Sequence, residues 1–224
     1  MRHFRSICVI ACFCLSLSAC STEPTLQFEQ PQPFAVTPQA EFPEALWGQY
    51  VNVQDSTSLQ LTAKALIRQT QHIASTTEQE LQKDSVLYRL ENGRFYTNEF
   101  PEGLPVKRRA RDSLFVLVIT TDTLFYQNPV QQVRKFKGIY FLNQQLGPNR
   151  WKVFCLKPQG KKIIQLQYVD DSVDRLKLHE ICPIREEKKV FLANPTQKEL
   201  RKFLRKGGFS HREIFTKLPK EIGV

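Results

Sequence analysis

The sequence has little methionine and glycine, with one Met and nine Gly among 224 residues. No glycine-rich loop of the kind that cradles phosphate occurs. No stretch after the N-terminal region approaches the ~20 apolar residues of a membrane-spanning helix. What the chain does have is 41% hydrophobic residues, including 16 Phe and six Tyr. This composition predicts a globular body with an aromatic, strand-rich core.

Common catalytic and metal-site patterns are also missing. There is no G-x-S-x-G and no H-E-x-x-H, and His72, His179 and His211 are widely spaced. The carboxylates single out no catalytic pair. We therefore predict no catalytic residues, no metal and no cofactor. An acidic group is too short for a calcium loop and is expected to be a solvated hairpin tip: Asp170, Asp171 and Asp174.

The N-terminus reads as an export signal. Two arginines precede an apolar stretch of eleven residues, Ile7–Leu17, which is too short to span a bilayer. Leu17-Ser18-Ala19-Cys20 then resembles the lipobox of bacterial lipoproteins. The resemblance implies cleavage between Ala19 and Cys20 and a lipid on the Cys20 thiol. The protein is then expected to be anchored to a membrane of the cell envelope, at the periplasmic face of the outer membrane.

The charge is strongly positive, at a formal +10. Removal of residues 1–19 takes away two arginines and leaves 30 cations against 22 anions. Such a surplus suggests nucleic acid in an intracellular protein, but export makes that ligand unexpected. Anionic lipid, acidic glycan or an envelope protein are the partners that remain, beside the alternative of a basic surface that only interacts with solvent.

Domain boundaries follow from composition. Residues 20–44 contain five prolines and no apolar periodicity, which predicts a tether behind the lipidated cysteine. With ~150 residues typical of a domain, residues 45–224 are expected to form one. Its period-two pattern predicts a mainly β fold, an antiparallel meander closed as a barrel or stacked as a sandwich. The expected strands are 48–53, 58–62, 66–70, 86–90, 94–97, 114–120, 124–127, 135–143, 151–157, 162–169 and 175–181.

Helices are expected at three places. Thr77 with Glu80 predicts a short helix over 78–83. Thr196-Gln197-Lys198-Glu199 is a capping box that opens a C-terminal helix over 197–206, and Gly207-Gly208 ends it. Ser210-His211-Arg212-Glu213 suggests a second short helix after it.

Two basic clusters and two cysteines are further candidate functional residues. The first cluster follows a proline-bounded turn, and the second lies along the C-terminal helix; both are expected to contact an anionic surface. Cys155 and Cys182 are the mature thiols besides Cys20, and a disulfide between them is an alternative to two buried thiols. The basic residues are Lys107, Arg108, Arg109 and Arg111 in the first cluster, and Arg201, Lys202 and Arg205 in the second.

Leu46-Trp47-Gly48-Gln49-Tyr50, at the start of the strand-rich region, resembles the opening of a lipocalin-type barrel. That family opens with Gly-x-Trp, and here Tyr50 stands in place of the Trp. The resemblance implies an apolar ligand cup and no enzyme activity. Three functions therefore stay open: a non-enzymatic binding or scaffold lipoprotein, a lipocalin-like carrier of a small apolar ligand, and an envelope hydrolase acting on glycan or lipid.

Overall fold

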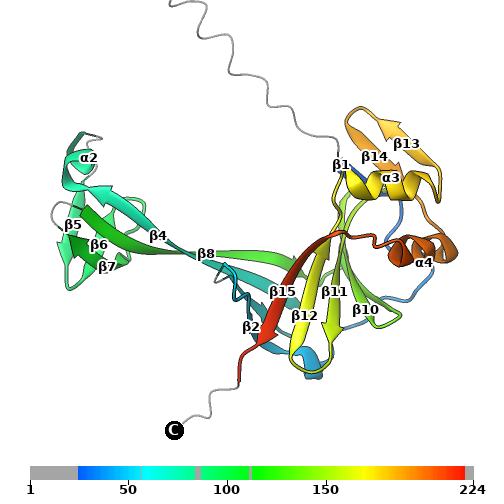
Figure 1. Ribbon diagram of the computed structural model, residues 1–224, viewed down its shortest axis with the longest axis horizontal. Coiled ribbons are helices and arrows are strands. Elements are labelled where there is room, and N and C mark those ends of the chain that lie inside the picture. Colours follow the sequence, from blue (N-terminus) through cyan, green and yellow to red (C-terminus); the bar gives the residue numbers. More distant parts are fainter. Residues whose placement is uncertain (1–24, 56, 84–86, 111–112, 220–224) are drawn as a thin grey trace, which may run out of the picture.

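A computed structural model describes residues 25–55, 57–83, 87–110 and 113–219. The fold is mainly β and mostly antiparallel, as predicted, and its one large sheet curls round without closing into a barrel. Three parts can be distinguished in Figure 1: a curled body, an outer layer of helices and short strands on one side of it, and an arm that projects from the other side.

The body is formed by strands that pair in the order β9-β10-β11-β12-β15-β2-β3-β4-β8. Its inner core is built from the alternate residues that point into the curl. The elements are η1 (Glu44–Leu46), β2 (Gly48–Val51), β3 (Ser58–Leu61), β4 (Ala65–Thr77), β8 (Ser113–Tyr126), β9 (Gln131–Phe136), β10 (Ile139–Gly147), β11 (Arg150–Gln159), β12 (Ile163–Tyr168) and β15 (His211–Lys217).

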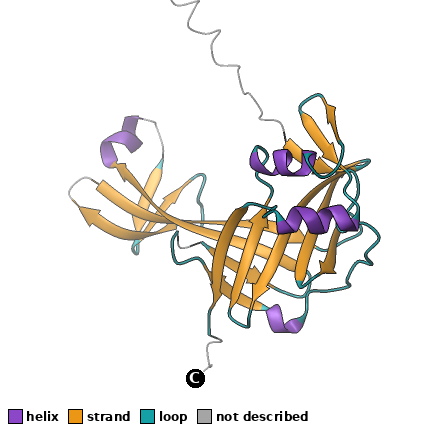
Figure 2. Ribbon diagram, turned by 45° about the vertical axis from the view of Figure 1, so that its right-hand side comes forward, coloured by secondary structure: helices purple, strands orange, loops and turns teal. Residues whose placement is uncertain are grey.

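The outer layer packs on the opposite face of β10 and β11 around a second, outer core, which includes Phe141, Phe203 and Phe209 (Figure 2). The only parallel pair among the described strands is β1 with β14. The elements are β1 (Thr25–Phe28), α3 (Val173–His179), β13 (Ile184–Glu187), β14 (Val190–Ala193) and α4 (Gln197–Arg205).

The arm consists of a two-stranded ribbon and a tip. The ribbon is the distal part of β4 and β8, residues 70–77 paired with 113–120. The tip adds a short helix and three strands around a small tip core of Leu81, Phe95, Leu104, Leu114 and Val116. Its elements are α2 (Glu78–Lys83), β5 (Tyr88–Glu91), β6 (Arg94–Thr97) and β7 (Leu104–Ala110).

The predicted tether is wrong from residue 25 onward, because that segment belongs to the fold. Strand β1 pairs with β14 and β11, and Phe28, Gln32 and Phe42 are buried. Further along, Gln39 donates its backbone N–H to Val133. The prolines suggested an extended, solvated chain, but the apolar residues between them enter both cores. The domain therefore begins near Thr25, and residues 20–24 lie outside the described part.

Two other predictions fail near the C-terminus. Residues 175–181, expected as a strand, are largely within helix α3, since Asp170 caps that helix and Leu178 is buried in the outer core. The expected helix after Ser210 is strand β15, where Phe215 points into the inner core and the segment pairs with β12. The predicted helices over 78–83 and 197–206 are confirmed, apart from one residue at the end of α4.

Two predicted strand boundaries are also wrong. Thr121–Thr123, expected as a turn, lies inside the single 14-residue strand β8, which suits β-branched residues. The expected strand 135–143 is split between β9 and β10 by a turn at Lys137-Gly138, where both residues have positive φ.

Candidate functional site

The arm is the most unusual surface of the molecule, because its ribbon lies in solvent between the body and the tip (Figures 1 and 2). Residues directly opposite each other in an antiparallel pair share a face, and alternate residues point to opposite faces. Ala74 pairs with Val116 and His72 with Val118, and Ala74, Val116 and Val118 belong to or pack on the tip core. This side is the inner face of the ribbon.

The other side, which we call the outer face of the ribbon, is also apolar. Ile73 pairs with Leu117, and Gln71 pairs with Ile119. Ile73 is 61% exposed and Ile119 is 48% exposed. Scattered single apolar residues are ordinary on a surface, but a contiguous apolar patch commonly marks an interaction site. The outer face therefore has the character of a binding surface.

In the described part of the chain, the edge of β4 is open along the whole ribbon, and the edge of β8 is open from Leu117 onward. Strand β3 pairs with β4 only as far as Gln69, and β7 pairs with β8 only as far as Val116. The backbone N–H and C=O groups along these edges are thus available to an added strand. An apolar face combined with open edges fits an extended protein segment better than it fits a glycan or a small molecule.

Strand β7, which carries Lys107, Arg108 and Arg109 of the first predicted cluster, pairs with the part of β8 nearest the tip. Lys107 is exposed on β7, and the pairing register places Arg108 opposite Phe115 and Arg109 opposite Leu114. Arg111 lies outside the described residues. The second cluster is on α4, where Arg201, Lys202 and Arg205 are exposed. The structure thus separates the two clusters, one at the tip of the arm and one on the body (Figure 1).

At the root of the arm, polar side chains cover one end of the inner core. Arg68 of β4 forms an ion pair with Glu213 of β15, and its Nη2 also donates to the hydroxyl of Tyr168, 3.0 Å away. Burial raises the pKa of Tyr168. His211 is exposed, with its Nε2 3.8 Å from Glu213. Because Glu213 and Tyr168 are both bound to Arg68, the cluster holds the base of the ribbon against β12 and β15.

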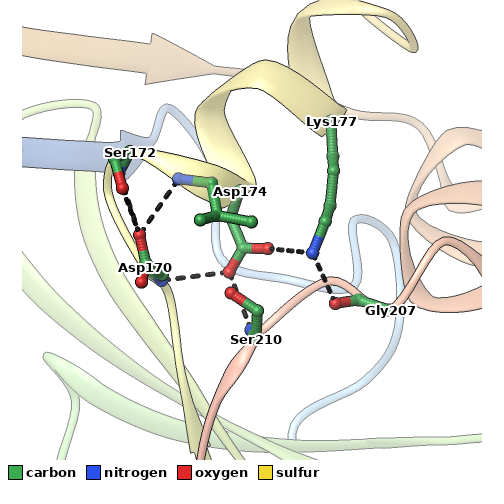
Figure 3. Close-up of polar contacts among 7 residues, drawn as sticks. Asp170, Ser172, Asp174, Lys177, Gly207 and Ser210 are labelled. Carbon is green, nitrogen blue, oxygen red and sulfur yellow. Dashed lines mark hydrogen bonds and ion pairs between the residues drawn. The ribbon is translucent and has the colours of Figure 1, made fainter.

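A second polar network lies where β12 meets α3, and it corrects the prediction of a solvated acidic hairpin tip (Figure 3). Asp174 is fully buried. Its Oδ2 accepts from the backbone N–H groups of Asp170 (3.0 Å) and Ser210 (2.8 Å), and its Oδ1 accepts from Lys177 Nζ (3.2 Å). Lys177 also donates to the carbonyl of Gly207 at 2.9 Å. The network ties α3 to the segment between α4 and β15.

Asp170 caps α3 in the same network. Its Oδ1 accepts from the backbone N–H of Val173 (3.0 Å) and from the backbone and hydroxyl of Ser172. These hydrogen bonds, led by that from Val173, lower the pKa of Asp170. These two acidic residues therefore have structural roles. Asp170 caps α3, and the buried Asp174 holds α3 against the segment between α4 and β15. The Asx-type spacing of Asp170 to Ser172 could have revealed the cap from sequence.

A cleft of about 320 Å³ lies between β1, β11 and the end of β12, and its lining includes Leu26, Lys152, Tyr168 and Asp171. Asp171 Oδ1 accepts from the backbone N–H of Leu26 at 2.5 Å. The lining does not include His211 or Glu213.

The two cysteines are both free and buried, so the alternative of a disulfide between them is wrong. Cys155 lies on β11, and Cys182 follows α3, both in the outer core. Burial raises the pKa of Cys182 to about 11 and that of Cys155 well above its usual range. Both are therefore packing residues rather than reactive thiols.

The lipocalin-like segment lies at the far end of the inner core. The Tyr50 ring is buried, and its hydroxyl donates to the carbonyl of Leu46 at 2.7 Å. Gly48 has φ of 141°, and a Cβ there would lie 2.8 Å from Cε of Lys217. The interior that a carrier would keep open for its ligand is occupied by side chains: Phe42, Tyr50, Leu59, Leu61, Leu66, Phe125, Val133, Tyr140, Leu142, Phe154, Leu156, Ile164, Leu166 and Phe215.

Within the described ranges, no group of His, Cys, Asp and Glu side chains is arranged to hold a metal ion. No helix in that part of the chain has the length and apolar character needed to cross a membrane. Cys20 and Ala19 lie outside it. Comparisons with protein-family models, with curated proteins and with solved structures give no match.

Proposed function

We propose that this protein is a non-enzymatic lipoprotein of the bacterial cell envelope that binds another envelope protein through its arm. The lipid on Cys20 would anchor it at the periplasmic face of the outer membrane. The observation that carries the binding role is the ribbon, whose outer face exposes Ile73 and Ile119, whose β4 edge is open, and whose β8 edge is open from Leu117 onward. Filling of the inner core by side chains supports this role over that of a carrier.

The partner that fits best is an extended protein segment. Added beside β4 or β8, it would satisfy the open backbone groups and cover Ile73 and Ile119. Lys107, which is exposed on the neighbouring strand β7, would favour an acidic residue at one end of that segment. The binding surface is thus a strand-shaped apolar strip beside a cationic end.

The binding role is tested with photo-crosslinking residues placed in the full chain in its own cells. A crosslinker at Ile119 should give an adduct with one partner protein, whereas one at Val53, which is 83% exposed on the body, should not. The identified partner is then purified. Ile73→Ser with Ile119→Ser should weaken its binding at least tenfold, and Val53→Ser should leave it unchanged.

Equal adducts at Val53 and Ile119, or unchanged affinity in the double variant, would refute the arm as the binding surface. An adduct of twice the mass of the chain would instead identify a second copy as the occupant.

The anchor is tested separately by replacing the lipidated residue. Cys20→Ser should abolish the acyl mass on the mature N-terminal peptide and release the protein from the membrane fraction. Cys155→Ser is the matched control, since Cys155 is buried at the core and should leave both the acyl mass and the fractionation unchanged. Retention of the Cys20→Ser variant in the membrane fraction would contradict the lipid anchor.

A further inference from the structure

The end of the body that carries the start of β1 has a composition suited to contact with a membrane. Three structural facts place its parts together. The backbone N–H of Thr25 donates to the carbonyl of Lys189 at 3.1 Å. The N–H of Leu26 donates to Asp171, which leads directly into α3. Leu146, near the end of β10, lines the same cleft as Thr25. We call this region the anchor end; it consists of the start of β1, the end of β10, the start of α3 and the turn between β13 and β14.

The length of chain before Thr25 keeps the anchor end close to the lipid. Four residues lie between Cys20 and Thr25, and five residue steps of a fully extended chain, at about 3.6 Å each, span at most ~18 Å. A tether running to residue 44 would have left the body free to turn in any direction. With the fold starting at Thr25, the chain end is instead held within about two Debye lengths of the bilayer surface.

The anchor end exposes both apolar and cationic side chains. Val173 and Leu176 of α3 are 43% and 64% exposed, one helical turn apart, and Leu146 is 56% exposed. Lys188 and Lys189 are both exposed in the turn between β13 and β14. Apolar side chains flanked by lysines are the combination that favours the headgroup layer of an anionic bilayer.

The acidic groups nearby are largely engaged. Glu187 is paired with Arg150 at 3.0 Å and with Arg185 at 3.1 Å, which leaves exposed Glu186 as the acid that offsets the two lysines. Arg185 also pairs with Glu29. The turn between β13 and β14 thus keeps a cationic character at its outermost point.

We infer that the anchor end docks on the membrane, with Lys188 and Lys189 against anionic headgroups and Leu146, Val173 and Leu176 in the interfacial layer. The inference rests on the proposed lipid anchor at Cys20. Docking leaves the arm free, because the arm leaves the body on the side away from α3, β13 and β14 (Figure 1). The lipid and the docked end together would orient the binding surface relative to the membrane.

The test uses the full lipidated protein reconstituted into vesicles of neutral phosphatidylcholine, or of the same lipid with about a third phosphatidylglycerol. A dye on Ser172→Cys reports contact through quenching by nitroxide-labelled lipid. A dye on Gln159→Cys, near the turn between β11 and β12, serves as the distant reference. Selective labelling is expected because Cys155 and Cys182 are buried.

We expect strong quenching at position 172 in anionic vesicles, weak quenching at 159, and less quenching at 172 in neutral vesicles. Lys188→Glu with Lys189→Glu should lower the ratio of docked to undocked protein at least 25-fold in 0.1 M salt, about fivefold for each lysine lost, with repulsion of the new glutamates added to it. Lys161→Glu with Lys162→Glu makes the same charge change at the opposite end and should have no effect. Leu176→Ser should reduce quenching in both kinds of vesicle.

Failure of the docking and failure of the anchor give different results. Protein that carries the acyl mass and floats with the vesicles, yet shows equal quenching at 172 and 159, overturns the docking and leaves the anchor intact. Equal quenching in neutral and anionic vesicles, unaltered by the lysine reversals, overturns the electrostatic contact. Absence of the acyl mass on Cys20 overturns both proposals.

Discussion

The body and the tip of the arm are both β units with their own cores, but the two cores differ greatly in size. In the described residues, the inner and outer cores of the body bury 14 and 13 side chains, whereas the tip core buries five. A small unit buries too little apolar surface to be very stable alone, and such units open locally without global unfolding. The contrast suggests a rigid body and an adaptable tip, which suits a surface that meets a partner.

The largest effect should come from the inner core. Phe125 is fully buried and contacts Phe42 and Phe154 edge-on, with ring centroids 6.1 and 6.3 Å apart. Phe125→Ala should lower the free energy of unfolding by about 3–5 kcal/mol, through lost burial and the cavity left behind. Urea denaturation followed by tryptophan fluorescence measures it. A change below ~1 kcal/mol would mean that the inner core is not the main source of stability.

The second prediction tests whether the outer layer unfolds together with the body. Asp174→Asn removes the charge that is paired with Lys177 in a buried site. Loss of one partner from a buried, hydrogen-bonded ion pair costs about 3 kcal/mol, because the other charge is left uncompensated. Urea denaturation should show a lower midpoint with an unchanged slope. Adding Lys177→Met should recover part of the loss, and a second transition would show instead that the outer layer unfolds independently.

A smaller and local effect is expected in the tip. Leu104 is one of the five buried residues there, and Leu104→Ala should remove about 2–3 kcal/mol from the stability of the tip alone. Amide hydrogen exchange should then be faster in β5, β6 and β7 and unchanged in β10, β11 and β12. Equal acceleration in both regions would show that tip and body form one cooperative unit, which would remove the contrast between them.

The parts of this molecule that could be predicted from sequence are those fixed by local chemistry. The capping box at Thr196 signals α4 within four residues and occurs where predicted. Asn92-Gly93, between the expected strands 86–90 and 94–97, is a similarly local turn signal, and β5 pairs with β6 across it. Strand β1 gave no such signal, because it is short and its partner β14 is some 160 residues away in sequence. Pairing over that distance depends on tertiary packing, which no local pattern records.

The proposed binding surface could not be predicted from the sequence for a related reason. Ile119 alternates with Phe115 and Leu117 in the same way as core residues do, and Ile73 lies beyond the end of the expected strand 66–70, so the sequence does not mark either residue as part of an exposed ribbon. Only the pairing of β4 with β8 beyond the end of β3 shows that the ribbon has left the body. Asp174 was predicted to be solvated, because acidic residues in a run usually are. It is buried instead, and there it accepts a hydrogen bond from the backbone N–H of Ser210, 36 residues later in the sequence.

The smallest predicted effect compares one motif in both regions. A capping box begins α4 of the body, with Thr196 and Glu199, and the same reciprocal bonds join Thr77 and Glu80 at the start of α2 in the tip. In each box the hydrogen bond from the threonine backbone is the main cause of a lowered glutamate pKa. Thr196→Ala should lower the free energy of global unfolding by about 1 kcal/mol.

The lowered pKa values fix the direction of the pH dependence. A glutamate whose pKa is lower in the folded state than its usual 4.5 stabilises the fold above that pH. The contribution declines as the pH falls through the lowered value. Glu199→Gln should therefore flatten the global unfolding free energy between pH 5 and about pH 3. Glu80→Gln should leave that curve as in the wild type and change only the pH dependence of hydrogen exchange in the tip. If both variants flatten the global curve equally, tip and body share one unfolding transition, and the adaptability inferred for the arm must come from bending of the ribbon instead of local opening of the tip.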